Sequence, residues 1–128
     1  MKITLLFLLV LTTTSGISQE VYTSHATQHF PSAEVISMDR VITVDDQKIT
    51  IKSVTNENKV KIQTLQITGK VTNYDNGYSF VEYRCTTRNS RSPSTVIIKK
   101  DRPSFITLLQ PSLTDHNTLE ELKILLDR

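Results

Sequence analysis

The sequence predicts a mostly β fold: an antiparallel meander of about six to eight strands, forming a curved sheet or small barrel, with a short C-terminal helix. Three observations support this prediction. Lys48 to Val54 alternates between apolar and polar residues, Asn76-Gly77 separates two strand-like runs, and the last residues change to a helical leucine spacing. The strands do not alternate with helices, as the strands of a parallel sheet would.

The N-terminus has the pattern of a secretory signal peptide. Lys2 gives a positive start, Ile3 to Leu11 is apolar, and Thr12 to Ser18 is small and polar. The apolar run is about half of the roughly 20 residues that a transmembrane helix needs. We therefore expect residues 1–18 to be a signal peptide and residues 19–128 to be a single β-rich domain, secreted or periplasmic.

The first half of the domain is expected to contain short strands joined by turns. Residues 19–32 form a mixed polar leading segment in which only Val21 and Tyr22 have strand character. Asp39-Arg40 predicts a bend and Asp45 to Gln47 a turn. The strands expected around these breaks span residues 33–38, 41–44 and 48–54. In the last of them, alternation places Ile49 and Ile51 on one buried face.

Lys59 to Thr72 is too long for one straight strand. Val60 and Ile62 share one phase, whereas later apolar residues occupy the other. One extra residue reverses the facing of all later side chains, so this change predicts a bulge or sharp bend near Gln63-Thr64. Gly69 would allow further coiling or a close backbone approach.

The Asn76-Gly77 pair supplies the positive φ angles of a tight hairpin, which predicts a returning strand from Tyr78 to Thr87. Asn89 to Ser94 is a loop by composition. The remaining expected strands span residues 95–99 and 104–110, with a turn at 100–103 between them.

The C-terminus predicts a short amphipathic helix from about Leu119 to Asp127. Thr118 and Glu121 have the spacing of a capping box, and leucines recur at helical intervals. The alternative is a last strand that closes the sheet.

Cys85 cannot form a disulfide within the chain, because it is the only cysteine. It lies within a strand-like run, which favours a buried small hydrophobic side chain. The alternative is an interchain disulfide.

No motif predicts catalysis, a cofactor or a metal. His25 and His29 have a spacing that could bind a metal on a helix, but the segment has no strong helix signal and no third ligand in register. Asp115-His116 could belong to a triad only with a shaped nucleophile turn, which three glycines in the chain do not provide. We expect a protein that is not an enzyme and has neither metal nor cofactor.

Basic residues gather between Arg84 and Arg102, opposed there only by Asp101. In a hairpin they would form two groups about 17 Å apart, which favours a solvated face over a single anion site. Arg88 and Arg91 would lie near the hairpin tip, where a loop at Asn89 to Ser94 could bind a protein partner. Interleaved aromatic residues are few, so we expect no nucleic-acid partner.

The predicted meander resembles the small lipocalin-like barrels in architecture alone. Those families carry a Gly-x-Trp motif near the first strand, whereas this chain has no tryptophan, so no family is assigned. The residues expected to line the interior are Ile49, Ile51, Leu65, Ile67, Phe80, Ile97 and Leu108.

We expect a non-enzymatic exported binding module without a membrane-spanning segment, whose partner is a small apolar ligand or a protein. The candidate binding residues are Leu65, Ile67 and Phe80 for a ligand, and Arg88 and Arg91 for a protein. The two alternatives are a lipocalin-like carrier and a secreted inhibitor of a surface protein.

Overall fold

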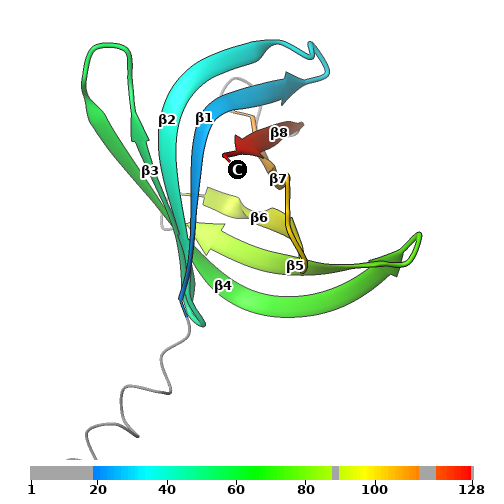
Figure 1. Cartoon of the computed structure of the whole chain (residues 1–128). Helices are drawn as coiled ribbons and strands as arrows, with labels where there is room; N and C mark the ends of the chain where they lie inside the picture. The colour runs from blue at the N-terminus through cyan, green and yellow to red at the C-terminus, as the bar shows by residue number, and fades with distance from the viewer. Residues whose placement is uncertain (1–18, 88–89, 113–117, 128) are drawn as a thin grey trace, which may run out of the picture.

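The computed structural model describes residues 19–87, 90–112 and 118–127, and within these ranges the chain forms eight antiparallel strands that close into one barrel (Figure 1). Each strand pairs with its neighbours in sequence, and the first pairs with the last. The strands are β1 (Glu20–Phe30), β2 (Val35–Val44), β3 (Lys48–Val54), β4 (Val60–Asp75), β5 (Tyr78–Thr87), β6 (Ser90–Lys99), β7 (Phe105–Pro111) and β8 (Leu119–Leu126). The predicted meander and barrel are confirmed. The predicted signal peptide lies outside the described residues.

The predicted C-terminal helix is wrong, because the segment forms β8. This strand pairs with β7 on one side and β1 on the other. Beyond its end, the Asp127 amide donates to the Thr23 carbonyl at 2.9 Å. Leu122 and Ile124 alternate into the core, so the leucine pattern also fits a period of two. A helix here would leave the edges of β1 and β7 unpaired, and tertiary pairing overrides the local helical preference.

The leading segment is a full strand, contrary to the prediction. In β1 a register shift lies between Ser24 and Ala26 against both neighbouring strands. Tyr22 and Ser24 face inward before the shift, and Thr27 faces inward after it. The shift explains why no single alternation appears in the sequence.

The predicted bend at Asp39-Arg40 is also wrong, since both residues lie inside β2. The chain deviates there only in its register with β1: Ser24 pairs with Arg40, whereas Ala26 pairs with Ser37. The irregularity is therefore a bulge between paired strands, and β2 continues through it.

The long strand β4 has its bulge later than predicted. Its pairing with β3 is regular through Thr64, and the register shift against β5 falls between Ile67 and Gly69. The apolar pattern of Val60 and Ile62 does not mark a buried face, because these side chains are 54% and 66% exposed. Gly69 lies at the bulge, and a Cβ added there would meet only ordinary contacts at 3.9 Å, so the glycine is not required by a close approach.

The predicted hairpin between β4 and β5 is confirmed. Asn76 and Gly77 have φ angles of 50° and 83°, which a two-residue turn with two positive φ angles requires. The hairpin reaches well beyond the rest of the barrel (Figure 1).

The predicted turn at Asp45 is confirmed as well. The Asp45 carboxylate accepts hydrogen bonds from the Gln47 and Lys48 amides at 2.8 Å each. These hydrogen bonds lower the pKa of Asp45.

The predicted loop at Asn89 to Ser94 is wrong over most of its length, because β6 begins at Ser90. Asn89 itself lies outside the described residues. Cys85 pairs with Ser94, and Thr87 pairs with Ser90, so the strand continues close to the hairpin tip. Serines and a proline are tolerated here because pairing with β5 determines the conformation.

The buried apolar side chains form one core cluster inside the barrel. Most of the predicted interior residues are confirmed, with Ile49, Leu65 and Leu108 almost fully buried. Phe80 and Ile97 are only half-buried, because β5 and β6 turn Val81 and Ile98 inward instead. Both misplacements are errors of one residue in phase.

Cys85 is fully buried, as predicted. Burial raises the pKa of its thiol to about 11, because the thiolate loses its hydration inside the barrel.

We expect the packed rows of the barrel to dominate its stability. Truncation of the fully buried Ile124 to Ala should lower the free energy of unfolding by about 2–5 kcal/mol. The matched control Ile62→Ala removes the same atoms from an exposed site and should change it by less than about 0.5 kcal/mol. Urea denaturation measures both, and equal losses would contradict the placement of these two strands.

We expect Cys85 to resist alkylation in the folded protein. At about pH 8 little of a thiol with this pKa is ionised, and burial excludes the reagent. Iodoacetamide should label Cys85 slowly in buffer and fast in urea, as followed by mass spectrometry. Labelling in buffer at the rate of free cysteine, or an interchain disulfide in the purified protein, would contradict this expectation.

Candidate functional site

A row of polar side chains crosses one end of the barrel on the inner face. Arg40 on β2 pairs with Ser53 on β3, and Ser53 pairs with Lys61 on β4. Side chains directly opposite one another in adjacent antiparallel strands share a face. These three residues share the inward phase of Ile42 and Ile51, which belong to the core. We call this end of the barrel, beside the β3–β4 turn, the mouth.

The opposite wall of the mouth is also polar. Gln110 on β7 pairs with Glu120 on β8, and its amide donates to the Glu120 carboxylate at 3.3 Å. Gln63 on β4 donates to Gln110 at 3.2 Å. His29 Nδ1 lies 3.6 Å from the other Glu120 oxygen. This chain of contacts joins β4, β7, β8 and β1 across the mouth.

Residues of both walls line an open cavity of about 520 Å³. Its apolar floor consists of Ile51, Leu108 and Leu122, each less than 5% exposed. Small-molecule sites commonly have this form: a mostly apolar concave surface with a few polar groups, of about 300–1,000 Å³. The other lining residues are Met38, Arg40, Ser53, Thr55, Lys61, Ile62, Gln63 and Gln110.

Arg40 is the most unusual residue of the mouth. Its guanidinium is half-buried, and burial lowers the pKa of Arg40, which nevertheless remains protonated at neutral pH. Nη2 lies 3.4 Å from the Met38 sulfur, a weak acceptor, and the buried Nε has no hydrogen-bond partner within the described structure. A charge removed from water without a strong acceptor is energetically unfavourable.

No protein-family model, curated protein or solved structure matches this chain. The small eight-stranded barrel fits a lipocalin-like architecture. Because one fold supports many functions, the function has to be argued from the site itself.

The structure does not bring the predicted ligand-binding residues together. Leu65 is fully buried in the core. Ile67 lines a second cavity of about 230 Å³ at the other end of the barrel, together with Tyr83 and Lys70. Phe80 lies on the opposite face of β5 from the core residue Val81.

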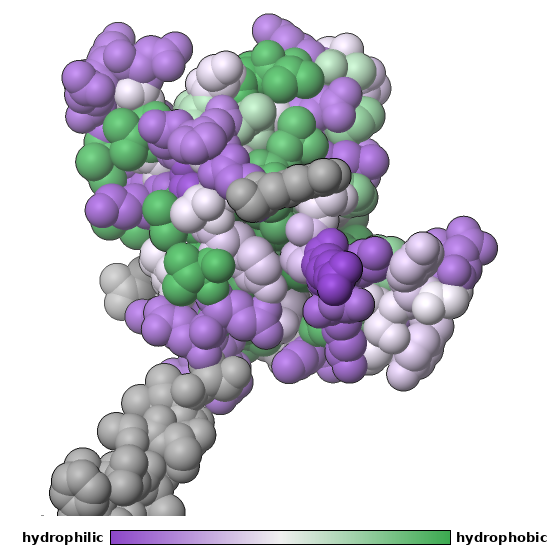
Figure 2. Space-filling model, in the orientation of Figure 1, coloured by the Kyte–Doolittle hydropathy of each residue, from purple (hydrophilic) through white to green (hydrophobic). Residues whose placement is uncertain are grey.

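The predicted protein-binding residues stay untested. Arg88 lies outside the described residues, and Arg91 falls within β6 with its side chain outside the described part. Lys99, farther along that strand, lies 4.1 Å from the centre of the Tyr78 ring, a contact typical of a solvated surface cation. On the face seen in Figure 2, hydrophobic and hydrophilic residues are interspersed.

Sequence reasoning missed the residues of the mouth. The signal was present, because Arg40 and Ser53 continue the inward phase of Ile42 and Ile51 by one step. The assumed bend at Asp39-Arg40 interrupted that phase. Glu120 was missed because the last segment was predicted to be a helix, whereas Gln110 ended a predicted strand whose partner was not recognised.

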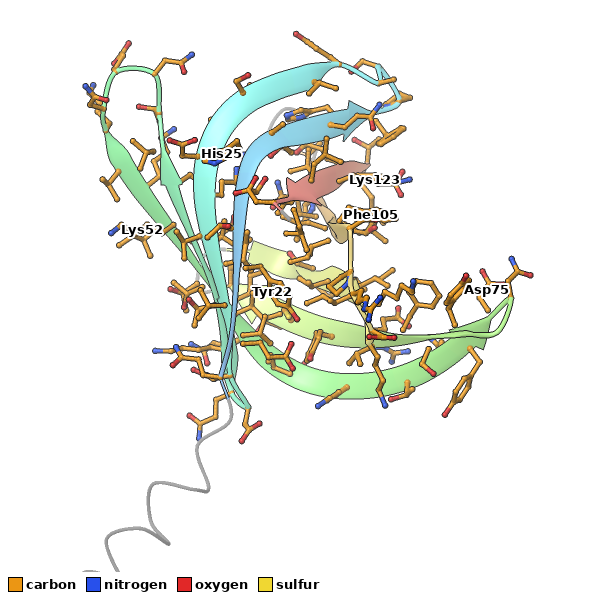
Figure 3. The ribbon with its side chains drawn as sticks, in the orientation of Figure 1. Tyr22, His25, Lys52, Asp75, Phe105 and Lys123 are labelled. Carbon is orange, nitrogen blue, oxygen red and sulfur yellow. The ribbon has the colours of Figure 1, made fainter. Side chains whose placement is uncertain are left out.

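His25 and His29 lie on one strand, but the bulge in β1 separates their environments. His25 is exposed on the outer face, beside β2 (Figure 3). Its Nδ1 lies 2.6 Å from Asp39 and its Nε2 3.3 Å from Asp127. The hydrogen bond to Asp39, and then the charge of Asp127, raise the pKa of His25.

Throughout the described ranges, no three His, Cys, Asp or Glu side chains are arranged to hold a metal ion, and no helix is long and apolar enough to cross a membrane.

We expect His25 to stabilise the strand seam more in acid than in base. A pKa raised by folding gives a contribution that is complete below the unfolded value of about 6.5 and is lost as the pH rises through the folded value. The urea midpoint of the native protein should therefore exceed that of His25→Gln by more near about pH 6 than near about pH 9. The same difference at both pH values would contradict the two carboxylate contacts.

Proposed function

We propose that the mature protein is an exported, non-enzymatic binding module that carries a small, partly apolar ligand in the mouth of its barrel, as a lipocalin-like carrier does. The observation that supports this proposal is the cavity of about 520 Å³ above the floor of Ile51, Leu108 and Leu122. The signal-like sequence of residues 1–18 supports export.

The floor and the walls suit different parts of a ligand. Ile51, Leu108 and Leu122 come from three different strands and are held by the core beneath them, so the floor is a preformed apolar surface. An apolar group placed on it would leave water and gain about 25 cal/mol per Å² of buried surface. The polar walls above can then orient the remainder of the ligand.

The chemistry of the mouth supports binding rather than catalysis. Ser53 is the serine of the lining, and within the described residues no histidine is hydrogen-bonded to it as a general base. Glu120 hydrogen-bonds Gln110 and contacts His29, so its oxygens are engaged in joining the strands.

Filling the cavity should weaken ligand binding. Ser53→Phe would project a ring from β3 into the mouth, whereas Lys52→Phe would add the same ring to the outer face of the same strand (Figure 3). We expect Ser53→Phe to weaken binding of the neutral dye N-phenylnaphthylamine by about tenfold or more, or about 1.4 kcal/mol, with little change for Lys52→Phe. Fluorescence titration measures the affinity, and thermal unfolding verifies that both variants are folded.

Native mass spectrometry of the protein from its producing cells provides the complementary test. A reproducible small-molecule adduct on the native protein that is lost in Ser53→Phe would support the carrier. Dye affinity unaffected by a folded Ser53→Phe variant would contradict ligand binding in the mouth.

A further inference from the structure

The cavity in the mouth carries an unbalanced positive charge. Among the residues that the structure describes, Arg40 and Lys61 are the cations that line it, and no aspartate or glutamate does so. Within the described ranges, neither cation forms an ion pair with a carboxylate. Glu120, the nearest acidic residue along the row of the opposite wall, is held by Gln110 and His29.

The two cations are placed for one shared acceptor. Arg40, Ser53 and Lys61 lie in register on adjacent strands, so their Cβ atoms are about 5 Å apart from one strand to the next. Arg40 is half-buried and Lys61 is exposed. An anion entering from solvent would therefore meet the lysine first and the guanidinium deeper in the mouth.

The guanidinium has unused hydrogen-bonding capacity in this position. Its five N–H groups form a planar fork that matches the oxygens of an acid group, and here a methionine sulfur is the acceptor within reach of Nη2. The buried Nε has no partner in the described structure. An acid group would supply strong charge-assisted hydrogen bonds at the point where the protein has removed water.

The apolar floor of the cavity favours a ligand whose remaining atoms are apolar. Leu108 and Leu122, which pair across β7 and β8, line the same cavity as Arg40. A ligand with its acid group at Arg40 would lay its remaining atoms across these leucines and Ile51. A purely polar anion would leave this floor in contact with water, so the geometry favours an amphipathic ligand.

Resting on the proposed carrier function, we propose that the ligand is an amphipathic anion, with one acid group bound by Arg40 and Lys61 and an apolar body against Ile51, Leu108 and Leu122. The acid group is within the reach of both cations, and the Ser53 hydroxyl between them can donate a further hydrogen bond.

The test uses three ligands with the same apolar chain and different head groups: decanoate, decanol and decyltrimethylammonium. Each competes with N-phenylnaphthylamine for the full-length mature protein at neutral pH and low salt. We expect decanoate to displace the dye at a concentration at least about tenfold lower than decanol, because hydrogen bonds to charged groups contribute more than neutral ones. The cationic ligand should be the weakest.

Substitution of Arg40 and Lys61 tests whether these residues cause the preference for decanoate over decanol. Arg40→Met replaces the guanidinium with an uncharged, flexible side chain. It should weaken the affinity for decanoate by about tenfold or more and leave the affinity for decanol unchanged. Lys61→Met should have a smaller effect in the same direction, because its side chain is more solvated. The control Lys52→Met removes a cation from the outer face of β3 and should change neither ligand.

The outcomes separate the two proposals. If decanoate and decanol compete equally well, or if Arg40→Met lowers the affinity for both by the same factor, the proposal of an anionic ligand is overturned. The proposed carrier function would still stand. Failure of the native protein to bind the dye or any of the three ligands would overturn the carrier function, and this inference with it. A urea midpoint for Arg40→Met close to that of the native protein shows that a lost preference is not a loss of folding.

Discussion

The pairing of β1 with β8 is the constraint on which the rest of the structure depends. It converts a meander, whose first and last strands would expose unpaired backbone groups, into a closed barrel. Closure requires the last segment to be extended despite its helical leucine spacing. It also requires β1 to match two neighbours at once, and the register shifts between Ser24 and Ala26 allow it to do so.

The closed barrel divides its interior into an apolar part and a polar part. Rows such as Val44, Ile49 and Leu65 are almost fully buried and supply the hydrophobic stabilisation. At the mouth, the equivalent row is Arg40, Ser53 and Lys61. The partial desolvation of Arg40 is unfavourable by itself, and the apolar rows below offset it. The hydrophobic stabilisation of the barrel therefore comes from the buried rows and not from the mouth row.

On the outer face, by contrast, the cations are placed against aromatic rings. Lys123 lies 5.1 Å from the ring centre of Phe30 and 4.8 Å from that of Phe105, which joins β1, β8 and β7 on the outside (Figure 3). The long lysine stem covers apolar surface while its ammonium group stays in water. Lys99 covers Tyr78 in the same way. Arg40 differs from these residues because its charge faces the interior.

The sequence by itself determined the β class, the hairpin at Asn76-Gly77, the strand Lys48–Val54 and the burial of Cys85, because local alternation and turn residues specify these features directly. Only the tertiary structure decided that Leu119–Leu126 is a strand, where the bulges lie, and that Phe80 and Ile97 do not join the core. The candidate site belongs to this second group. Its residues come from strands far apart in sequence, and a one-residue error of phase moves each of them to the opposite face, so barrel closure and register were needed to bring Arg40, Lys61 and the leucine floor together.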